Sequence, residues 1–316
     1  MKRAFITGIG GQDGFYMTEL LKLKGYEVFG LENRTGGGDL SNPADMKKAV
    51  QMSQPDEVYN FAGITDLKTA YEKPELTNKI NYECVGHVLD ECVKVNPHVR
   101  FLQASSSEIF IPQEGALNEE SPRDWETKNP YAGAKMTADK DFIQKFRNEK
   151  NIFCCSAFLC NHESPKRHES SVLRKITKNI VDIKNGKLDI LQIGNVEMAR
   201  DFGYAGDYVE AMWRMLQCEK PEDFVIATGE LHTVKEAIDI AANFLGMPVI
   251  WLGSGLQTKA YDAAGKKIVE VNPEFFRENE KFPKRGDASK ARRILDWEPH
   301  MNFTGLIELM VRAALV

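Results

Sequence analysis

Short apolar runs alternate with longer amphipathic segments over the first 160 residues of the chain. The apolar runs have the length of strands, and they cover 3–7, 26–31, 56–61, 99–105 and 152–158. The segments between them have helical spacing, and they cover 13–24, 43–53, 78–95 and 131–148. Strands that alternate with helices in this way are typical of βαβ units. The pattern therefore predicts an α/β fold with a parallel sheet.

The alternation changes after Asn161, where a polar loop follows the fifth predicted strand. Beyond this loop, helices are predicted near 172–185, 206–217, 233–245, 288–295 and 303–314, with short strands at 189–192 and 224–228. The sequence contains no internal repeat and no low-complexity linker between the two halves. We therefore expect a smaller α/β lobe that is interleaved with the last strands of the first half.

Composition and charge exclude several classes of protein. The 316 residues carry a net charge of -5 with scattered Lys and Arg, which argues against a nucleic-acid-binding face. No apolar stretch approaches the roughly 20 residues of a membrane-spanning helix, so a cytoplasmic protein without membrane contact is predicted. The six cysteines and six histidines lack metal-ligand spacing. We therefore expect reduced, buried thiols and no metal site.

A glycine-rich loop lies between the first predicted strand and the first predicted helix. Gly8, Gly11 and Gly14 have the spacing of a dinucleotide-binding fingerprint variant, with Gln12 and Asp13 between them. Backbone N–H groups at such a turn can reach a pyrophosphate, and the following helix N-terminus favours negative charge. No Gly-Lys-Ser/Thr follows, which argues against a P-loop. The loop therefore predicts dinucleotide binding.

This loop suggests a role for each part of the chain. Residues 1–160, together with about 202–230, are predicted to form a Rossmann-type, doubly wound parallel sheet that binds the dinucleotide. Residues 161–201 and 231–316 are then expected to form the substrate-binding lobe.

The residues after the second predicted strand bear on the choice of dinucleotide. Glu32 stands where an acidic side chain can bond the adenine ribose 2′-hydroxyl, which favours NAD. Arg34 follows two residues later and could pair with the 2′-phosphate of NADP. Both could also be solvated loop charges. The sequence favours NAD and leaves NADP open.

Tyr131 and Lys135 begin a predicted helix at a spacing of four residues, so their side chains share one helix face. A free tyrosine has a pKa of about 10, and an adjacent cation favours the phenolate. The pair therefore predicts a tyrosine base that is active near neutral pH. The same spacing occurs by chance in many helices, but the glycine loop upstream favours the functional interpretation.

A run of three serines followed by Glu108 lies at the end of the fourth predicted strand, where ligands bind in parallel sheets. One of these serines can hold a sugar hydroxyl that Tyr131 deprotonates. Glu108 could take a proton from the carbon next to a newly formed ketone. The alternative for Glu108 is a structural bond to the backbone or to a helix terminus.

These residues resemble the extended short-chain dehydrogenase/reductase family, and most closely the GDP-mannose 4,6-dehydratases. The resemblance runs over nearly the whole chain. In the first half it includes 8–14, 55–60, 103–108 and 129–131. The more specific segments lie in the second half, and they are 161–165, 174–176, 200–201, 206–213 and 286–291.

The resemblance implies a set of site residues. The implied catalytic residues are Ser106, Glu108, Tyr131 and Lys135. The residues that would line the GDP-sugar site are Thr65, Asn161, Lys175, Arg200 and Arg277. The implied cofactor-binding residues add Asp39, Leu40, Ala62, Tyr131 and Lys135 to the glycine loop and to Glu32 and Arg34.

The resemblance also implies a reaction and an assembly. NAD(P)-dependent oxidation at C4 of a GDP-manno-type sugar would begin when Tyr131 removes the C4 hydroxyl proton. Glu108 would then remove the C5 proton, water would leave from C6, and the hydride would return to C6. Helices matching 78–95 and 131–148 form a dimeric four-helix bundle in the resembled family, so a homodimer or higher homo-oligomer is expected.

Four segments depart from the resembled pattern. The connection at 32–37 is short, Ile109 to Ile111 replace a Tyr-Gly pair, Asp66 replaces a histidine, and the polar residues 281–285 replace an apolar segment. These departures leave open a GDP-sugar (hexose or heptose) C4 dehydrogenase, reductase or epimerase that does not remove water. A dinucleotide sensor on the same fold is a third alternative, but Tyr131 and Lys135 argue against it.

Overall fold

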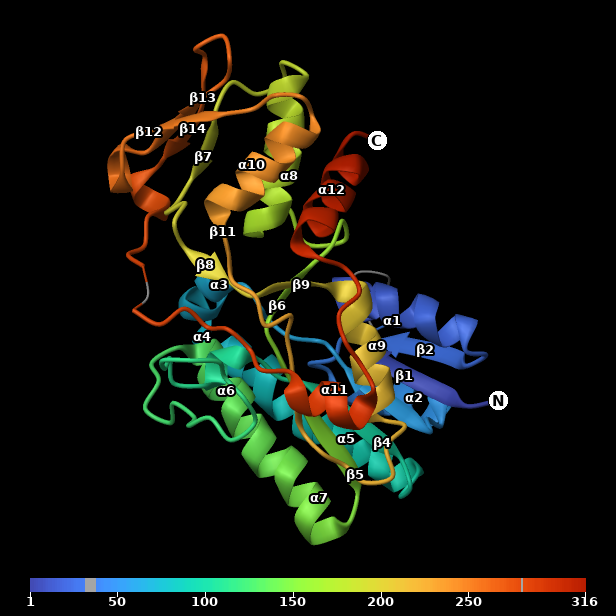
Figure 1. The fold of residues 1–316 in the computed structure, drawn as a ribbon. Helices are drawn as coiled ribbons and strands as arrows, with labels where there is room; N and C mark the ends of the chain where they lie inside the picture. Colours follow the sequence, from blue (N-terminus) through green and yellow to red (C-terminus); the bar gives the residue numbers. More distant parts are fainter. Residues whose placement is uncertain (32–37, 280) are drawn as a thin grey trace.

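A six-stranded parallel sheet forms the larger, lower part of the structure in Figure 1, which is a computed structural model that describes residues 1–31, 38–279 and 281–316. The strand order is β10-β5-β4-β3-β1-β2, and every neighbouring pair is parallel. The strands are β1 (Arg3–Thr7), β2 (Glu27–Leu31), β3 (Glu57–Asn60), β4 (Arg100–Ala104), β5 (Phe153–Leu159) and β10 (Phe224–Ile226). The order reverses between β1 and β3, which is where such sheets bind ligands. The predicted α/β fold is confirmed.

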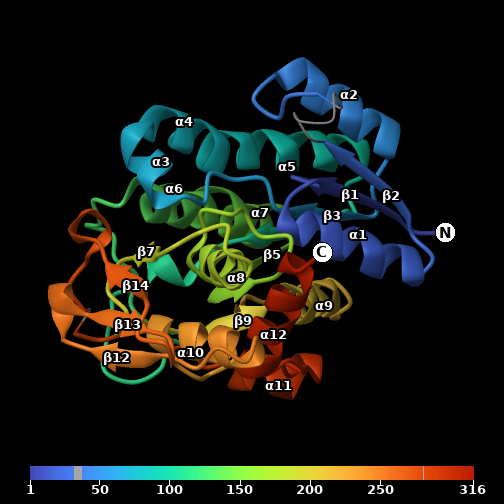
Figure 2. The same ribbon diagram turned by 90° about the horizontal axis from the view of Figure 1, so that it is seen from above.

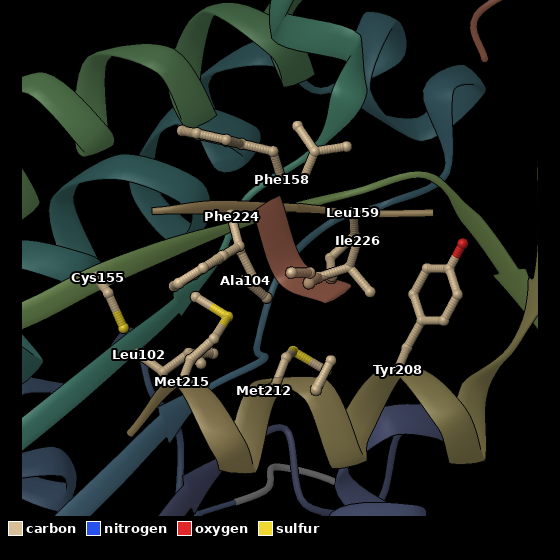
Figure 3. Packing of buried hydrophobic residues seen from close by; sticks show 14 of the residues in the cluster. Leu102, Ala104, Cys155, Phe158, Leu159, Tyr208, Met212, Met215, Phe224 and Ile226 are labelled. Atoms are coloured by element: carbon tan, nitrogen blue, oxygen red, sulfur yellow. The ribbon is translucent and has the colours of Figure 1, made fainter. Parts of the chain in front are cut away.

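Helices cover both faces of this sheet. α1 (Gln12–Leu23) and α9 (Ala205–Met215) pack on one face, and α2 (Pro43–Ser53) and α5 (Cys84–Val95) pack on the other (Figure 2). Because both faces are covered, the strands consist of nearly continuous apolar runs. Tyr208, Met212 and Met215 point from α9 toward the strands, among side chains of β4, β5 and β10 (Figure 3).

Two long predicted helices are interrupted by π-helical turns. The segment predicted at 78–95 is the π turn η1 (Lys79–Glu83) followed by α5, and two unpredicted short helices precede it, α3 (Leu67–Glu72) and α4 (Pro74–Asn78). The segment predicted at 131–148 is α6 (Pro130–Ala138), the π turn η3 (Asp139–Gln144) and α7 (Lys145–Lys150). The rings of Tyr82 in η1 and Phe142 in η3 lie 5.0 Å apart. This contact between the two turns is a tertiary feature that helical periodicity does not reveal.

A second hydrophobic cluster lies beside the sheet and joins three helices to a small mixed sheet. The helices are α8 (Val172–Lys184), α10 (Val234–Phe244) and α12 (Phe303–Ala314). The sheet order is β12-β13-β14-β7, with β12 (Ile250–Leu252), β13 (Lys259–Tyr261), β14 (Lys267–Val271) and β7 (Leu191–Ile193). The sequence pattern predicted β7 but missed β12 to β14, since strands of three to five residues leave little periodicity.

Short strand pairs connect the two clusters. β6 (Asn161–Glu163) runs beside β9 (Phe202–Tyr204), and β8 (Ala199–Arg200) pairs with β11 (His232–Thr233). α11 (Ser289–Leu295) then returns the chain to the large sheet, where Ala291 and Leu295 join the first cluster. The chain therefore crosses between the clusters several times, and the crossings converge near the carboxyl ends of β4 and β5.

The structure also bears on membrane, metal and thiol chemistry. Among the described residues, no helix is long and apolar enough to cross a bilayer. Within the same ranges, no group of three or more His, Cys, Asp or Glu side chains is placed to hold a metal ion. All six cysteines are free, and five of them are buried.

Met212→Ala is expected to destabilise the protein because Met212 is fully buried under the sheet. A cavity of this kind costs about 2–5 kcal/mol of unfolding free energy. Urea unfolding followed by circular dichroism measures the loss. Met52→Ala is the matched control, since the Met52 side chain is 65% exposed in α2. Equal losses for the two variants would contradict the assigned packing of α9.

Candidate active site

Glycines in the first loop allow backbone segments to approach one another closely. Gly8 has a φ of +67°, and a Cβ there would lie 3.0 Å from the Ala62 backbone. A Cβ on Gly14 would lie 2.4 Å from the Gly8 carbonyl oxygen. Gly11 begins α1 without a side-chain cap, so the first N–H groups of the helix lack a side-chain acceptor. This cradle fits a pyrophosphate.

A cavity of about 520 Å³ lies over this loop. Six residues predicted for the cofactor line it, and they are Gly8, Gly11, Gln12, Asp39, Leu40 and Ala62. Gly14 does not line it but packs beneath the loop, while Glu32 and Arg34 lie outside the described residues. Lys166 and Arg167 also line the cavity, and the sequence analysis missed them. The adjacent Lys-Arg pair is visible in the polar loop after Asn161, but its proximity to the glycine loop is a property of the fold.

A second cavity of about 250 Å³ adjoins the first, and Thr65 and Arg167 line both. It brings together all four predicted catalytic residues, Ser106, Glu108, Tyr131 and Lys135. Asp13 lines this second cavity, and Asn161, Arg200 and Arg277 line its far end. Residues from seven separate segments of the chain therefore meet at the carboxyl edge of the sheet.

Tyr131 lies in the first turn of α6, which the sequence sets through its cap. The Asn129 side chain accepts hydrogen bonds from the backbone N–H of Tyr131 (3.0 Å) and Ala132 (3.4 Å). Pro130 occupies the first helical position, where its missing N–H costs nothing. The start of the helix is thus locally encoded, and it places the phenol in the cavity.

Burial raises the pKa of Tyr131, and a hydrogen bond with the Ser106 side chain partly opposes this effect. This is opposite to the direction predicted from the sequence, in which Lys135 favours the phenolate, and that prediction is wrong for this structure. The physical reason is that a buried phenolate loses hydration. The charge of Lys135 does not offset this loss.

Lys135 lies one turn further along α6 and is buried. Its ammonium donates a 2.7 Å hydrogen bond to the carbonyl oxygen of Ala104, the last residue of β4. Burial lowers the pKa of Lys135 to about 8, against the smaller opposing effect of Asp13. Lys135 therefore fastens α6 to the end of β4 and can change its charge near neutral pH.

Ser106 and Glu108 lie on a single turn of 3-10 helix, η2 (Ser107–Ile109), directly after β4. Ser106 caps this turn, since its hydroxyl oxygen accepts a 3.1 Å hydrogen bond from the Glu108 backbone N–H. The Glu108 side chain is 30% exposed and lines the cavity, and its carboxylate pairs with Lys284 at 2.9 Å. The sequence analysis missed Lys284 as a site residue.

Asp13 and His162 form a partly buried pair that joins the glycine loop to β6. His162 Nε2 lies 3.1 Å from both Asp13 carboxylate oxygens, and the His162 ring stacks on Tyr208 at 4.8 Å. Burial raises the pKa of Asp13, but the His162 and Arg167 charges outweigh it and the net shift is downward. Burial lowers the pKa of His162, but Asp13 outweighs it and the net shift is upward. Each group thus stabilises the charged form of the other.

A third cavity of about 260 Å³ continues from the second and shares Asn161, Arg200 and Arg277 with it. Its other walls are mostly apolar and include Phe275. Lys175 does not line the cavity, but its ammonium lies 4.4 Å above the Phe275 ring. Four of the five residues predicted for the sugar-nucleotide site therefore lie near one another, whereas Thr65 lies on the cofactor side of the second cavity.

The chain is similar to known dehydratases over almost its whole length. Residues 35–310 match the family described as GDP-mannose 4,6 dehydratase. A GDP-mannose 4,6 dehydratase from Drosophila melanogaster is 36% identical over 99% of this chain and 86% of its own. GDP-mannose 4,6 dehydratase 1 from Arabidopsis thaliana is 36% identical over 98% of this chain and 89% of its own.

Solved structures confirm the fold. RMD from Pseudomonas aeruginosa, solved with NADPH, has a TM-score of 0.83 at 21% identity, covering 100% of this chain and 99% of its own. UDP-glucose 4-epimerase from Thermus thermophilus, solved with NAD, has a TM-score of 0.81 at 21% identity, covering 99% and 98%. At this identity the likeness establishes the fold alone.

Lys135→Met is expected to alter how the stability of the protein depends on pH. Folding lowers the Lys135 pKa from 10.5 to about 8, so the unfolded chain binds the extra proton between these values. The destabilising effect of the ammonium is fully present below the folded pKa and disappears as the pH rises toward the unfolded pKa. As the pH rises from about 8 to 10.5, the unfolding free energy of wild type should therefore increase relative to that of the variant by on the order of 3 kcal/mol.

Denaturant unfolding at a series of pH values measures this difference. Lys145→Met is the control, because Lys145 is exposed in α7. The curve for this control should run parallel to the wild-type curve. A constant difference in unfolding free energy between wild type and Lys135→Met across this pH range would show that folding does not lower the Lys135 pKa.

Proposed function

The chain belongs to the GDP-mannose 4,6-dehydratase family, and we propose that it converts a GDP-linked, manno-configured sugar into its 4-keto-6-deoxy product. One observation carries this proposal. Ser106, Glu108, Tyr131 and Lys135 meet in a single cavity that lies between the glycine-loop cavity and the pocket of Arg200 and Arg277. A reaction that needs both hydride transfer and loss of water uses all of these groups.

The shared walls of the cavities suggest how the nucleotide sugar lies. Arg200 and Arg277 line both the second and the third cavity, so the diphosphate would sit between them. The mostly apolar pocket with Phe275 then suits the base. The sugar would extend toward Tyr131. We infer that residues 161–201 and 231–316 mainly bind the nucleotide sugar.

The glycine-loop cavity suits NAD or NADP. Its cradle, together with Lys166 and Arg167 in the lining of the same cavity, would offer backbone donors and two cations to the phosphates. When bound, the nicotinamide would accept the hydride from C4 and later return it to C6. We infer that residues 1–160 with about 202–230 bind this dinucleotide.

Tyr131, Ser106 and Lys135 support the oxidation step. Tyr131 would take the C4 hydroxyl proton while Ser106, whose side chain interacts with the phenol, holds the sugar hydroxyl. The hydrogen bond to Ala104 holds the Lys135 ammonium at the end of β4, so the ammonium lies close to the cavity. The new 4-keto group acidifies the C5 proton, which links the first step to the second.

Glu108 supports the elimination step. Its carboxylate would take the C5 proton and transfer it to the departing C6 hydroxyl, which leaves as water. The proton that Tyr131 removed balances the one that C5 regains when hydride returns to C6. Homo-oligomer formation through the helices at 78–95 and 131–148 stays a prediction.

Incubation of the purified protein with GDP-mannose tests the function. A mass decrease equal to one water, without accumulation of reduced nicotinamide, is the expected result. Reduced nicotinamide without water loss would instead indicate a C4 dehydrogenase, and the same assay with a GDP-heptose separates hexose from heptose specificity. No turnover together with tight cofactor binding would indicate a dinucleotide sensor.

Tyr131→Phe and Glu108→Gln divide the reaction into its two steps. Tyr131→Phe should abolish C4 oxidation, with a loss of at least about 100-fold that is typical of a missing acid/base group. Glu108→Gln should retain hydride transfer from C4 but stop the loss of water. Mass spectrometry and the absorbance of reduced nicotinamide follow both steps. Full activity of Glu108→Gln would contradict its assigned role.

Gly14→Ala tests the phosphate cradle. The new methyl group would press on the Gly8 carbonyl and displace the loop. We expect about a tenfold or greater loss of dinucleotide affinity, the equivalent of one charge-assisted hydrogen bond. Titration with NADH and NADPH by fluorescence measures the loss, and tighter binding of NADH is expected.

Gly133→Ala is the control for this titration, because a Cβ there meets only Thr127, at 3.9 Å. It should retain wild-type dinucleotide affinity. An unchanged affinity of Gly14→Ala would show that the cradle does not bind the pyrophosphate.

A further inference from the structure

One charge in the polar segment 281–285 is buried. The Lys284 side chain is only 9% exposed, whereas Lys281 and Arg285 on either side are exposed. A buried ammonium is costly unless it is paired, so its partner identifies what it does.

That partner is Glu108. The Lys284 ammonium donates to Glu108 Oε2 at 2.9 Å, and it lies 3.5 Å from the Glu108 backbone carbonyl oxygen. These are the hydrogen bonds of Lys284 within the described ranges. Lys284 does not line the cavity that Glu108 lines, so it contacts Glu108 from behind. The Glu108 carboxylate is therefore held at one oxygen, while its other oxygen, Oε1, has no hydrogen-bond donor among the described residues.

The backbone next to Lys284 is firmly anchored. The Leu117 N–H donates a 2.7 Å hydrogen bond to the Arg285 carbonyl oxygen, and the Leu117 carbonyl oxygen accepts a 2.7 Å bond from the Asp287 N–H. The buried Asp201 carboxylate accepts a 3.1 Å bond from the Gly286 backbone N–H. A Cβ on Gly286 would lie 2.3 Å from Ala227 Cβ, so the chain is pressed against the end of β10. Lys284 is thus tied to the large sheet, as Glu108 is.

We propose that Lys284 is the positioning residue for Glu108, which it holds through Oε2 so that Oε1 carries the proton from C5 to the C6 hydroxyl. This inference rests on the proposed dehydration. Oε1 takes the C5 proton as the C5=C6 double bond forms and the C6–O bond breaks. The same proton then joins the departing hydroxyl, and water is released. Oxidation at C4 needs none of these contacts, so Lys284 acts on the second step only.

Lys284→Met tests this role, since methionine has a similar length and no charge. We expect elimination to slow by about 100-fold, the cost of a catalytic group misplaced by roughly an ångström. Oxidation at C4 and the KM for GDP-mannose should stay within about twofold of wild type. In a single turnover, reduced nicotinamide should therefore accumulate in the variant but not in wild type. A purely structural lysine would not separate the two steps in this way.

Three further variants complete the experiment. Lys284→Arg, which keeps the cation, should restore elimination to within about tenfold of wild type. Lys281→Met, the same chemical change at an exposed lysine of the same segment, should behave as wild type. In the Glu108→Gln background, Lys284→Met should cause no further loss of elimination, because the positioned carboxylate is already absent.

The outcomes separate the two proposals. If wild type removes water from GDP-mannose while Lys284→Met, folded by circular dichroism, eliminates water at the wild-type rate, the role of Lys284 is wrong and the dehydratase function stands. If wild type does not remove water, both are overturned. If Lys284→Met does not fold, the Lys284→Arg variant tests the positioning role instead. Equal losses of oxidation and elimination in that variant would refute the role.

Discussion

The hydrogen bond from Lys135 to the Ala104 carbonyl oxygen is the interaction on which the site depends. It joins α6, which carries Tyr131, to the end of β4, which leads directly into Ser106 and Glu108. The bond is short and buried, so a change in its length would move the phenol relative to the serine and the carboxylate. Because the sheet is parallel, the ends of β1, β3 and β5 lie at the same edge and bring the glycine loop to this point.

Other buried polar contacts bring the later half of the chain to the same edge. The Asp13 and His162 pair joins the glycine loop to β6. The Asp201 carboxylate accepts backbone hydrogen bonds from Thr228, Gly229 and Gly286. Both carboxylates have several polar partners, so each defines one arrangement of the loops. The sheet thus determines where the site lies, and these two carboxylates fix the second half of the chain relative to the sheet.

The parts of the site that the sequence predicted are those encoded locally. Gly8 and Gly14 adopt backbone conformations or contacts that exclude a side chain, and their spacing is visible in the sequence. Tyr131 and Lys135 share a helix face whatever the tertiary fold, and Asn129 with Pro130 marks the start of that helix. The parallel sheet followed in the same way from apolar runs separated by helices.

The parts that the sequence did not predict depend on contacts between distant residues. Lys284 and Glu108 are 176 positions apart, and no local sequence pattern at either residue predicts that they pair. His162 is likewise 149 positions from Asp13. The pKa of Tyr131 was assigned the wrong direction because burial, which dominates the shift, is a property of the folded chain. The short strands β12 to β14 and the two π turns also depend on tertiary packing.

The two steps of the proposed reaction are assigned to different supports within one cavity. Tyr131 and Lys135 stand on α6 and its bond to β4, whereas Glu108 stands on a 3-10 turn that Ser106 caps and that Lys284 contacts from the other side. Ser106 is therefore shared by the two supports. Among the described residues, no hydrogen bond joins the segment 281–285 to α6 or to the glycine loop. A change in that segment can therefore alter elimination while leaving hydride transfer intact. This separation explains how one fold can host both a dehydratase and an enzyme that stops after C4 chemistry.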